Sequence, residues 1–333
     1  MIRLPLLLCL ILFCLALPAS AADSPKADIS NGLIKATLDL PDPISGFYRA
    51  TRFDWSGQIP SLEYKGHSYF GAWNTAPYSP KLHDALMGPV EEFLTNGAGL
   101  GYSEAKAGGT FLKIGVGVIR KPEEAQFHQF NTYEIVDPGK WSIKKHADSV
   151  EFTQTVTDPN SGYAYIYTKT VRLVKGKPEL VLEHRLKNTG KKVIESDVYE
   201  HNFYVLDKQP VGPDTIVRFP FDVHAAGNFN GFAETKGHDL VYLKELPKGP
   251  SAQSELTGFS SDPKDYDITE ENRKTGAGVR QTCDRPLVRI NYWSIRSTAC
   301  PEAYIHMNIA PGKEFTWKIH YQFYANSPTS YGN

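Results

Sequence analysis

The strongest constraint in this sequence is an alternation of apolar and polar residues with a period of two. The segment "EFTWKIHYQFYA", residues 314–325, shows it over its full length. One set of alternate positions holds Phe315, Trp317, Ile319, Tyr321 and Phe323, and the other holds Thr316, Lys318, His320 and Gln322. Successive side chains of a β-strand point to opposite faces, so this segment is predicted to be a half-buried strand.

The same pattern recurs along most of the chain, and turn-forming residues separate its repeats. "SVEFTQTVTD" from residue 149 and "ELVLEHRLKN" from residue 179 both alternate. "DPNSG" at 158–162, "KGKP" at 175–178, "NTGKK" at 188–192 and "PGK" at 311–313 are typical turns. Strands spaced in this way predict an all-β chain with a large antiparallel β-sandwich. The polar segment 244–274 is predicted to be a loop, with room for a short helix near residues 268–273.

The N-terminus has the pattern of a secretory signal peptide. Arg3 precedes the apolar run "LPLLLCLILFCLALP", and "ASAAD" offers small residues for cleavage after Ala21 or Ala22. We therefore expect a signal peptide at residues 1–22, one domain at residues 28–326 and a C-terminal tail at 327–333. The mature protein is expected to be secreted or periplasmic. A retained N-terminal anchor is the alternative.

Cysteine use supports one crosslink in the mature chain. Of the four cysteines, Cys9 and Cys14 lie in the predicted signal peptide, which leaves Cys283 and Cys300. Two cysteines in an oxidising compartment predict one disulfide. A reactive thiol is the alternative.

Several classes of function have no support in the sequence. The formal net charge is −1 at pH 7, and no concentrated basic segment favours nucleic acid or an anionic membrane as a partner. Residues 88–122 are rich in glycine but lack the Gly-Lys-Ser/Thr of a phosphate-binding loop. Within that stretch, Glu92 and Lys113 are candidate cleft residues. No zinc-binding cysteine pattern and no His-Glu-x-x-His motif occurs.

Two arginines and an acid lie among aromatic residues in "GFYRATRFDWSG", residues 46–57. Arg49, Arg52 and Asp54 are therefore candidate contacts for a hydroxylated or carboxylated ligand, because the guanidinium fork suits such groups. The alternative is a structural Arg–Asp pair that clamps a hairpin.

A histidine and several acids share the segment "SDVYEHNFYVLD", residues 196–207. On an alternating strand, His201 would lie on the same face as Glu195, Asp197 and Tyr199. Imidazole can give or accept a proton near neutral pH, so His201 is a candidate acid or base. The alternative is a hydrogen-bonded core histidine.

A third candidate is Glu302 in "STACPEAYIHMNIAPGKEFTW", residues 297–317. It follows Cys300 and Pro301 and opens an alternating segment. A carboxylate held between a crosslink and a strand would be rigid, and rigidity favours a general base. An exposed loop acid is the alternative.

The order of these segments resembles the galactose mutarotase-like superfamily, which includes the aldose 1-epimerases. "EHNFYVLD" is similar to that family's Asn-His-x-Tyr-Phe-Asn-Leu motif, with Glu200 in place of the asparagine and His201 in register. "CPEAYIHMNIAPG" is similar to the segment that carries the family's glutamate, here Glu302. "TRFDWSG" is similar, less specifically, to the arginine segment, here Arg52.

This resemblance implies a β-sandwich that binds a mono- or oligosaccharide and opens and recloses a sugar ring without a metal or organic cofactor. Glu302 would be the base that accepts the anomeric hydroxyl proton, His201 the acid that protonates the ring oxygen, and Arg52 a group that orients a hydroxyl. The other residues that we predict to contact substrate are Arg49, Asp54, Lys113, Glu200, Asn202 and Tyr304.

One departure from the family pattern keeps other functions open. Aldose 1-epimerases carry an earlier histidine in an Asn-x-x-His-Gly-Gly context, and "AKAGGTFLKIG" has the glycines without the histidine. A non-catalytic carbohydrate-binding module is therefore one alternative. A glycoside hydrolase would need Glu302 to face Glu200 or Asp197 across a cleft. A polysaccharide lyase would set Tyr199 or Tyr304 beside an arginine.

Overall fold

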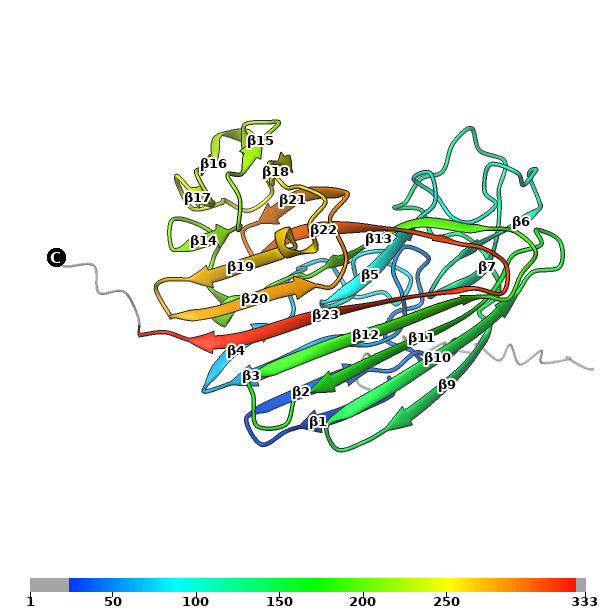
Figure 1. Cartoon of the computed structure of the whole chain (residues 1–333), viewed down its shortest axis with the longest axis horizontal. Helices are drawn as coiled ribbons and strands as arrows, with labels where there is room; N and C mark the ends of the chain where they lie inside the picture. The colour runs from blue at the N-terminus through cyan, green and yellow to red at the C-terminus, as the bar shows by residue number, and fades with distance from the viewer. Residues whose placement is uncertain (1–23, 328–333) are drawn as a thin grey trace, which may run out of the picture.

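The structure is a computed structural model that describes residues 24–327. The predicted signal peptide lies outside the described residues, as do positions 328–333 of the predicted tail. The described chain consists of antiparallel β-sheets joined by turns and loops (Figure 1). The predicted all-β sandwich is therefore confirmed.

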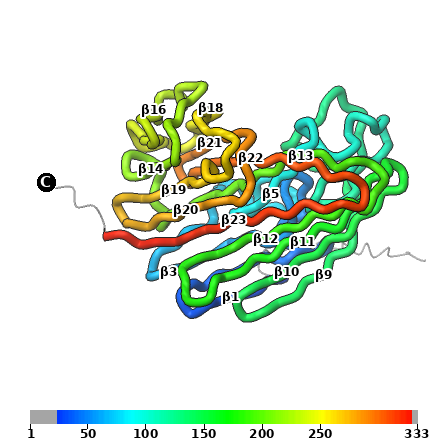
Figure 2. The backbone as a smooth tube through the Cα atoms, viewed as in Figure 1, coloured from blue at the N-terminus to red at the C-terminus, as the bar shows by residue number. Residues whose placement is uncertain are grey.

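One large sheet forms the base of the molecule. In spatial order its ten strands are β16 (Ala233–Lys236), β17 (Asp239–Tyr242), β14 (Thr215–Arg218), β19 (Asp267–Asn272), β20 (Ala277–Cys283), β23 (Glu314–Ala325), β12 (Glu179–Asn188), β11 (Ala164–Leu173), β10 (Ser149–Thr157) and β9 (Lys140–Lys145). Figure 2 traces β9 to β12 as successive hairpins, with β23 returning from the far end of the chain to lie beside β12.

Three smaller sheets complete the fold. The six-stranded sheet has the order β15 (His224–Ala225), β18 (Ala252–Thr257), β21 (Arg289–Ile295), β22 (Thr298–Ile309), β13 (Ile194–His201) and β5 (Val90–Leu94). The four-stranded sheet contains β1 (Lys26–Ser30), β2 (Ile34–Asp39), β3 (Gln58–Tyr64) and β4 (His67–Phe70). The three-stranded sheet contains β6 (Thr110–Lys113), β7 (Gly117–Arg120) and β8 (Ile135–Asp137).

Helical structure in the described chain is limited to short 3₁₀ turns. These are η2 (Leu206–Lys208), η3 (Phe229–Gly231) and η4 (Pro263–Asp265). Across residues 24–327 no helix has the length and apolar character needed to cross a membrane.

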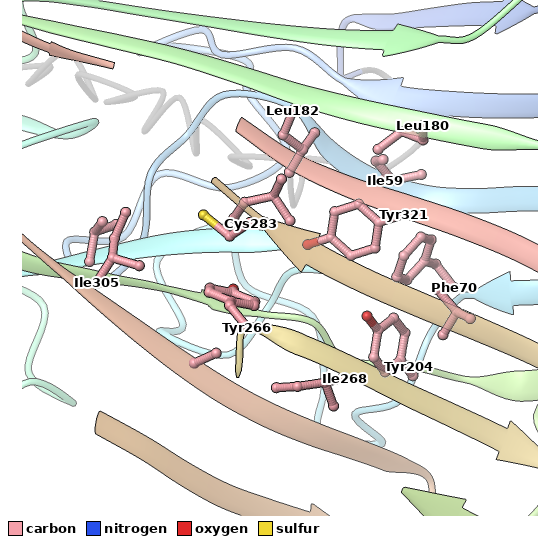
Figure 3. Packing of buried hydrophobic residues seen from close by; sticks show 14 of the residues in the cluster. Ile59, Phe70, Leu180, Leu182, Tyr204, Tyr266, Ile268, Cys283, Ile305 and Tyr321 are labelled. Atoms are coloured by element: carbon pink, nitrogen blue, oxygen red, sulfur yellow. The ribbon is translucent and has the colours of Figure 1, made fainter. Parts of the chain in front are cut away.

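Alternation places the core where the sequence predicted it. On β23 the buried side chains include Trp317, Ile319, Tyr321 and Phe323, while Lys318, His320 and Gln322 are exposed. The apolar face of the ten-stranded sheet packs against the four-stranded and the six-stranded sheets. Tyr69 and Phe70 of β4 contact Phe323, and Asn202 after β13 accepts a hydrogen bond from Tyr321. Figure 3 shows part of this core, with Tyr321, Tyr204 and Phe70 close together.

The segment 244–274 differs from its prediction as a loop. It contributes strands β18 and β19, and residues 268–273 are strand rather than helix up to Asn272. Ile268, Glu270 and Asn272 are buried on alternate positions of β19. The period of two was therefore present in the sequence, but polar residues at two of its three buried positions concealed it.

The predicted disulfide is absent, since Cys283 and Cys300 are both free and buried. Cys283 ends β20 in the core of the large sheet, beside Tyr266 and Tyr321 (Figure 3). Cys300 lies on β22 of the six-stranded sheet, where its Sγ accepts a hydrogen bond from the Phe203 amide at 3.2 Å. The two thiols belong to different hydrophobic clusters, which is why they do not pair.

Candidate functional site

The outer face of the six-stranded sheet collects the candidate residues into two rows. Cross-strand pairing joins Glu255, Asn291 and Glu302 in the first row. The second row joins Arg289, Tyr304, Tyr199 and Glu92 across β21, β22, β13 and β5. Residues directly opposite one another on antiparallel strands have neighbouring side chains, so sheet register alone brings together groups that are far apart in sequence.

These rows form the floor of a cavity of about 470 Å³. Its lining comprises Arg52, Trp73, Asp84, Leu94, Gly97, Gln129, Phe130, Tyr199, His201, Phe203, Gln253, Glu255, Arg289, Asn291, Trp293, Glu302 and Tyr304. Several aromatic rings and a few convergent polar groups are typical of a small-molecule site. Of the nine predicted catalytic and substrate-binding residues, Arg52, His201, Glu302 and Tyr304 line this cavity.

Glu302 and His201 are in direct contact at the cavity floor. His201 Nε2 lies 3.3 Å from Glu302 Oε1, and both side chains are almost fully buried. The Asn291 amide donates to Glu302 Oε2 at 2.8 Å, and the Tyr304 hydroxyl donates to the same oxygen at 3.3 Å. Two donors on one oxygen fix the carboxyl plane and leave the other oxygen facing the imidazole.

Burial shifts both members of this pair toward their neutral forms. It raises the pKa of Glu302 to about 7, although the hydrogen bond from Asn291 and the charge of Arg52 oppose the shift. Burial lowers the pKa of His201 well below its usual value, and the nearby positive charge of Arg52 adds to that effect. These shifts favour a protonated Glu302 beside a neutral His201 below about pH 7, and their 3.3 Å contact places the imidazole next to that proton.

Aromatic rings hold the imidazole in place. Phe203 stacks on His201 with 3.7 Å between ring centroids and an interplanar angle of 6°, and Trp73 stacks on the far side of Phe203. Phe203 has a positive φ of 45°, which a bulky side chain adopts rarely. Trp293 meets the edge of His201 at 5.5 Å. This packing limits His201 to one ring orientation.

Arg52 lies in a network of acids and a tyrosine. Its Nε donates to Glu92 at 2.9 Å, one terminal nitrogen donates to Asp84 at 3.1 Å, and the other donates to the Tyr199 hydroxyl at 3.3 Å. Burial opposes ionisation of Glu92, but the charges of Arg52 and Lys113 outweigh it and lower the pKa of Glu92. Arg52 is therefore a fixed cation beside the Glu302–His201 pair.

The other predicted substrate contacts lie outside the cavity. Arg49 donates to the backbone carbonyl of Ile44. Lys113 donates to the Phe93 carbonyl at 2.8 Å and lies 3.6 Å from Glu92. The Asn202 side chain bonds to Tyr321 and to the Pro301 carbonyl.

Asp54 and Glu200 belong to a buried charged cluster on the inner face of the same sheet. Burial raises the pKa of Glu200 well above its usual range, and the charge of Glu91 adds to the shift. Asp54 accepts hydrogen bonds from the amide and hydroxyl of Ser56. Among the described residues, Glu91, His184 and Glu200 are the group whose ligand atoms lie close enough together to hold a metal ion.

Several cavity residues were not predicted from the sequence. Arg289, Asn291 and Trp293 alternate on β21 with a polar and aromatic face, a signal present in "RINYWSI". Asp84 and Trp73 lie in loops, where period carries no information. The partner of His201 is Glu302, whereas Asp197, an expected partner on its own strand face, contacts His306 at 2.8 Å.

Comparisons with known proteins identify the fold. No protein-family model matches the chain, and no curated protein sequence matches it. Solved structures do match: a galactose mutarotase related enzyme from Lactobacillus acidophilus superposes with a TM-score of 0.55 at 14% identity, covering 92% of this chain and 98% of that one. The chain has the galactose mutarotase-like fold.

Two further solved structures with a similar fold support this assignment. A GalM/aldose epimerase homologue from C. elegans has a TM-score of 0.54 at 13% identity, with 91% of this chain and 100% of that one covered. A putative aldose 1-epimerase from Escherichia coli K12 has a TM-score of 0.52 at 11% identity, with 91% and 99% covered. At this identity the likeness concerns the fold.

Proposed function

We propose that this mutarotase-like protein is a secreted sugar epimerase that interconverts the anomers of an aldose or of a reducing-end sugar. The observation that carries the proposal is the contact between Glu302 and His201 on the floor of a cavity lined with aromatic rings. Sugar rings present apolar faces that pack on aromatic side chains, and their hydroxyl groups need polar partners at the rim.

The proposed chemistry uses one proton on the pair. Ionised Glu302 accepts the proton of the anomeric hydroxyl while protonated His201 gives a proton to the ring oxygen. The bond between C1 and the ring oxygen breaks, C1 rotates about its bond to C2, and reclosure on the other face inverts the anomer. On reclosure His201 takes back the proton of the hydroxyl that becomes the ring oxygen, while Glu302 returns its proton to the carbonyl oxygen, and this restores the pair.

Polarimetry with freshly dissolved α-anomers of glucose, galactose and other aldoses tests this proposal. Wild-type protein is expected to accelerate the change in optical rotation. Glu302→Gln removes the base, but its amide oxygen can still accept the hydrogen bonds that Asn291 and Tyr304 donate to Oε2. We therefore expect the acceleration to fall by about 10²–10⁴-fold. The matched control is Glu195→Gln, an exposed acid on β13. Wild-type protein that accelerates no sugar would refute the epimerase function.

A second candidate function has an observation in its favour. The guanidinium of Arg289 lies 3.8 Å from the centroid of the Tyr304 ring, and no described residue forms a salt bridge with it. An arginine beside a tyrosine suits a polysaccharide lyase that acts on a uronic acid. Incubation with uronic-acid polysaccharides would then produce an unsaturated product with ultraviolet absorbance.

The two carboxylate pairs expected for a glycoside hydrolase do not occur. Glu200 lies on the inner face of the sheet and is 1% exposed, while Asp197 pairs with His306 away from the cavity. A hydrolase needs two carboxyl groups that face each other across the substrate. Neither Glu200 nor Asp197 meets Glu302 in this way.

A further inference from the structure

The inner face of the six-stranded sheet carries a second polar constellation, separate from the cavity. Glu91 precedes Glu92 on β5, and Glu200 precedes His201 on β13, so alternation sends Glu91 and Glu200 inward. There they meet Lys169 of β11 and His184 of β12 from the ten-stranded sheet. The side chains of all four are 0–1% exposed. These four residues and Asp54 are here called the interior cluster.

The hydrogen bonds of the interior cluster leave one carboxyl group without a donor. Glu91 Oε1 lies 2.5 Å from His184 Nε2, and Glu91 Oε2 accepts from Lys169. Within residues 24–327 no donor group bonds to either oxygen of Glu200: its side chain meets another acid, Glu91, and the nearest cationic candidate is His184 Nε2, 3.9 Å from Oε1. Two buried carboxyl groups in contact cannot both stay ionised alone, so this site needs either a further cation or a proton shared between Glu91 and Glu200.

The charge of the interior cluster has the same implication. Asp54, Glu91 and Glu200 are three acids and Lys169 is one cation, so the formal charge would be −2 with all three acids ionised and His184 neutral, a state that burial opposes at Asp54 and Glu200 unless a further cation is present. A divalent cation would neutralise it. Lys169 contacts Glu91 through Oε2, while Oε1 faces His184 Nε2, so a metal ion would have to replace the hydrogen bond between these two atoms.

The geometry supports three ligands. One potential ligand atom from each of Glu91, His184 and Glu200 lies within 4.8 Å of the other two. Bonds of about 2.0–2.2 Å to zinc require separations between ligands of roughly 3–3.5 Å. The 2.5 Å contact would have to open and the 3.9 Å contact to close, each by roughly 1 Å or less. The His184 ring is already oriented, because it stacks on Trp317 at 4.3 Å with an interplanar angle of 2°.

We propose that Glu91, His184 and Glu200 form an interior site for a divalent transition metal, Zn²⁺ or Mn²⁺. One imidazole and two carboxylates suit these ions, whereas Ca²⁺ and Mg²⁺ favour sets made of oxygen alone. The ion would join β5 and β13 to β12 and hold the strands that carry Glu92 and His201. Since the site is closed to solvent, the ion would enter during folding.

Refolding with and without metal tests this site. The protein, free of any affinity tag, is unfolded in urea that contains EDTA, and the EDTA is then removed. It is refolded with one equivalent of ZnCl₂, of MnCl₂ or of neither, and is separated from free ions by gel filtration. Elemental analysis is expected to find about one ion per chain after refolding with one of the two metals. Bound metal stabilises only the folded state, so we expect the melting temperature to rise by roughly 5 °C.

Single substitutions distinguish metal binding at the interior site from metal binding in the cavity or at the surface. Glu200→Gln and His184→Gln are expected to lose the ion. Glu302→Gln, across the sheet in the cavity, should keep it. His306→Gln should also keep it, although exposed His306 with Asp197 and Glu195 can attract zinc.

Three results would overturn the proposal. The first is wild-type protein that refolds with neither metal bound. The second is an ion that disappears in His306→Gln, which would place it at the surface. The third is a Glu200→Gln variant that melts above the wild type, since this would show that Glu200 carries a proton in place of a metal ion. If the interior variants fail to fold, the metal contents of the wild type and of His306→Gln still test the proposal. None of these readouts depends on epimerase activity.

Discussion

The protonation of one pair of side chains governs the proposed chemistry. Glu302 and His201 must hold one proton between them, because one member accepts a proton while the other donates one. Their burial favours the neutral form of each, and the 3.3 Å contact lets the proton move to the ion-pair form.

The pH dependence of the rate follows from this proton count. Since burial raises the pKa of Glu302 to about 7, the pair loses its single proton as the pH rises through that value. We expect kcat/KM for mutarotation to be higher at pH 6 than at pH 8, and to fall about tenfold for each pH unit well above 7. Polarimetry across this range, corrected for the uncatalysed rate, measures it. A rate that increases through pH 7 would mean that Glu302 acts as a base without a proton on His201.

At the scale of elements, two strands connect the cavity with the interior cluster. β5 presents Glu92 outward and Glu91 inward, and β13 presents His201 outward and Glu200 inward. The position of each outward group therefore depends on how its strand is held from behind. Lys169 is central to that support, because it bonds to Glu91 and to the Ser56 carbonyl.

Removal of this lysine should be costly. Lys169→Met keeps much of the side-chain volume but leaves buried acids without their cation. Breaking a buried ion pair costs about 3–5 kcal/mol, so we expect the free energy of unfolding to fall by that amount. Urea denaturation followed by tryptophan fluorescence measures the change. The matched control is Lys177→Met, in an exposed pair 3.9 Å from Glu179, for which we expect about 0–1 kcal/mol. Similar losses for the two variants would contradict a stabilising role for Lys169.

The elements show which parts of this protein the sequence could predict. Alternation identified the faces of β10, β12, β13 and β23, because apolar and polar residues separate there. The prediction of a loop was wrong at β19, because buried Glu270 and Asn272 are polar residues of the kind expected at the surface. The contact between His201 and Glu302 depends on the pairing of β13 with β22, a register that a single sequence does not contain. The interior cluster was missed for the same reason, since residues 91, 184 and 200 meet only through the folding of three strands.

At the scale of the whole molecule, one sheet separates two polar environments. The cavity lies on its outer face, while the interior cluster on its inner face is enclosed by the ten-stranded sheet. Such an arrangement lets the sandwich hold Glu302 and His201 on strands rather than on loops, and strands position side chains more rigidly. Fold stability and site geometry are therefore coupled through β5 and β13.

The fold of the whole molecule also determines how its two thiols would react in the oxidising compartment that the predicted signal peptide implies. Burial raises the pKa of Cys283 to about 12 and that of Cys300 well above its usual value, so neither forms the thiolate that oxidation requires. We expect the full-length gene product, collected after export and unfolded in an alkylating agent without reductant, to carry two alkyl groups.

The same intact mass reports where the chain begins. Cleavage after Ala21 or Ala22 gives a chain that starts at Ala22 or Asp23, and the two differ by one alanine. Prior treatment with a reductant is the control, and it should add no further alkyl group. A mass without alkylation would mean that Cys283 and Cys300 do pair after export, which would require β20 and β22 to move together. A mass that includes residues 1–22 would mean that the N-terminal segment is kept as an anchor.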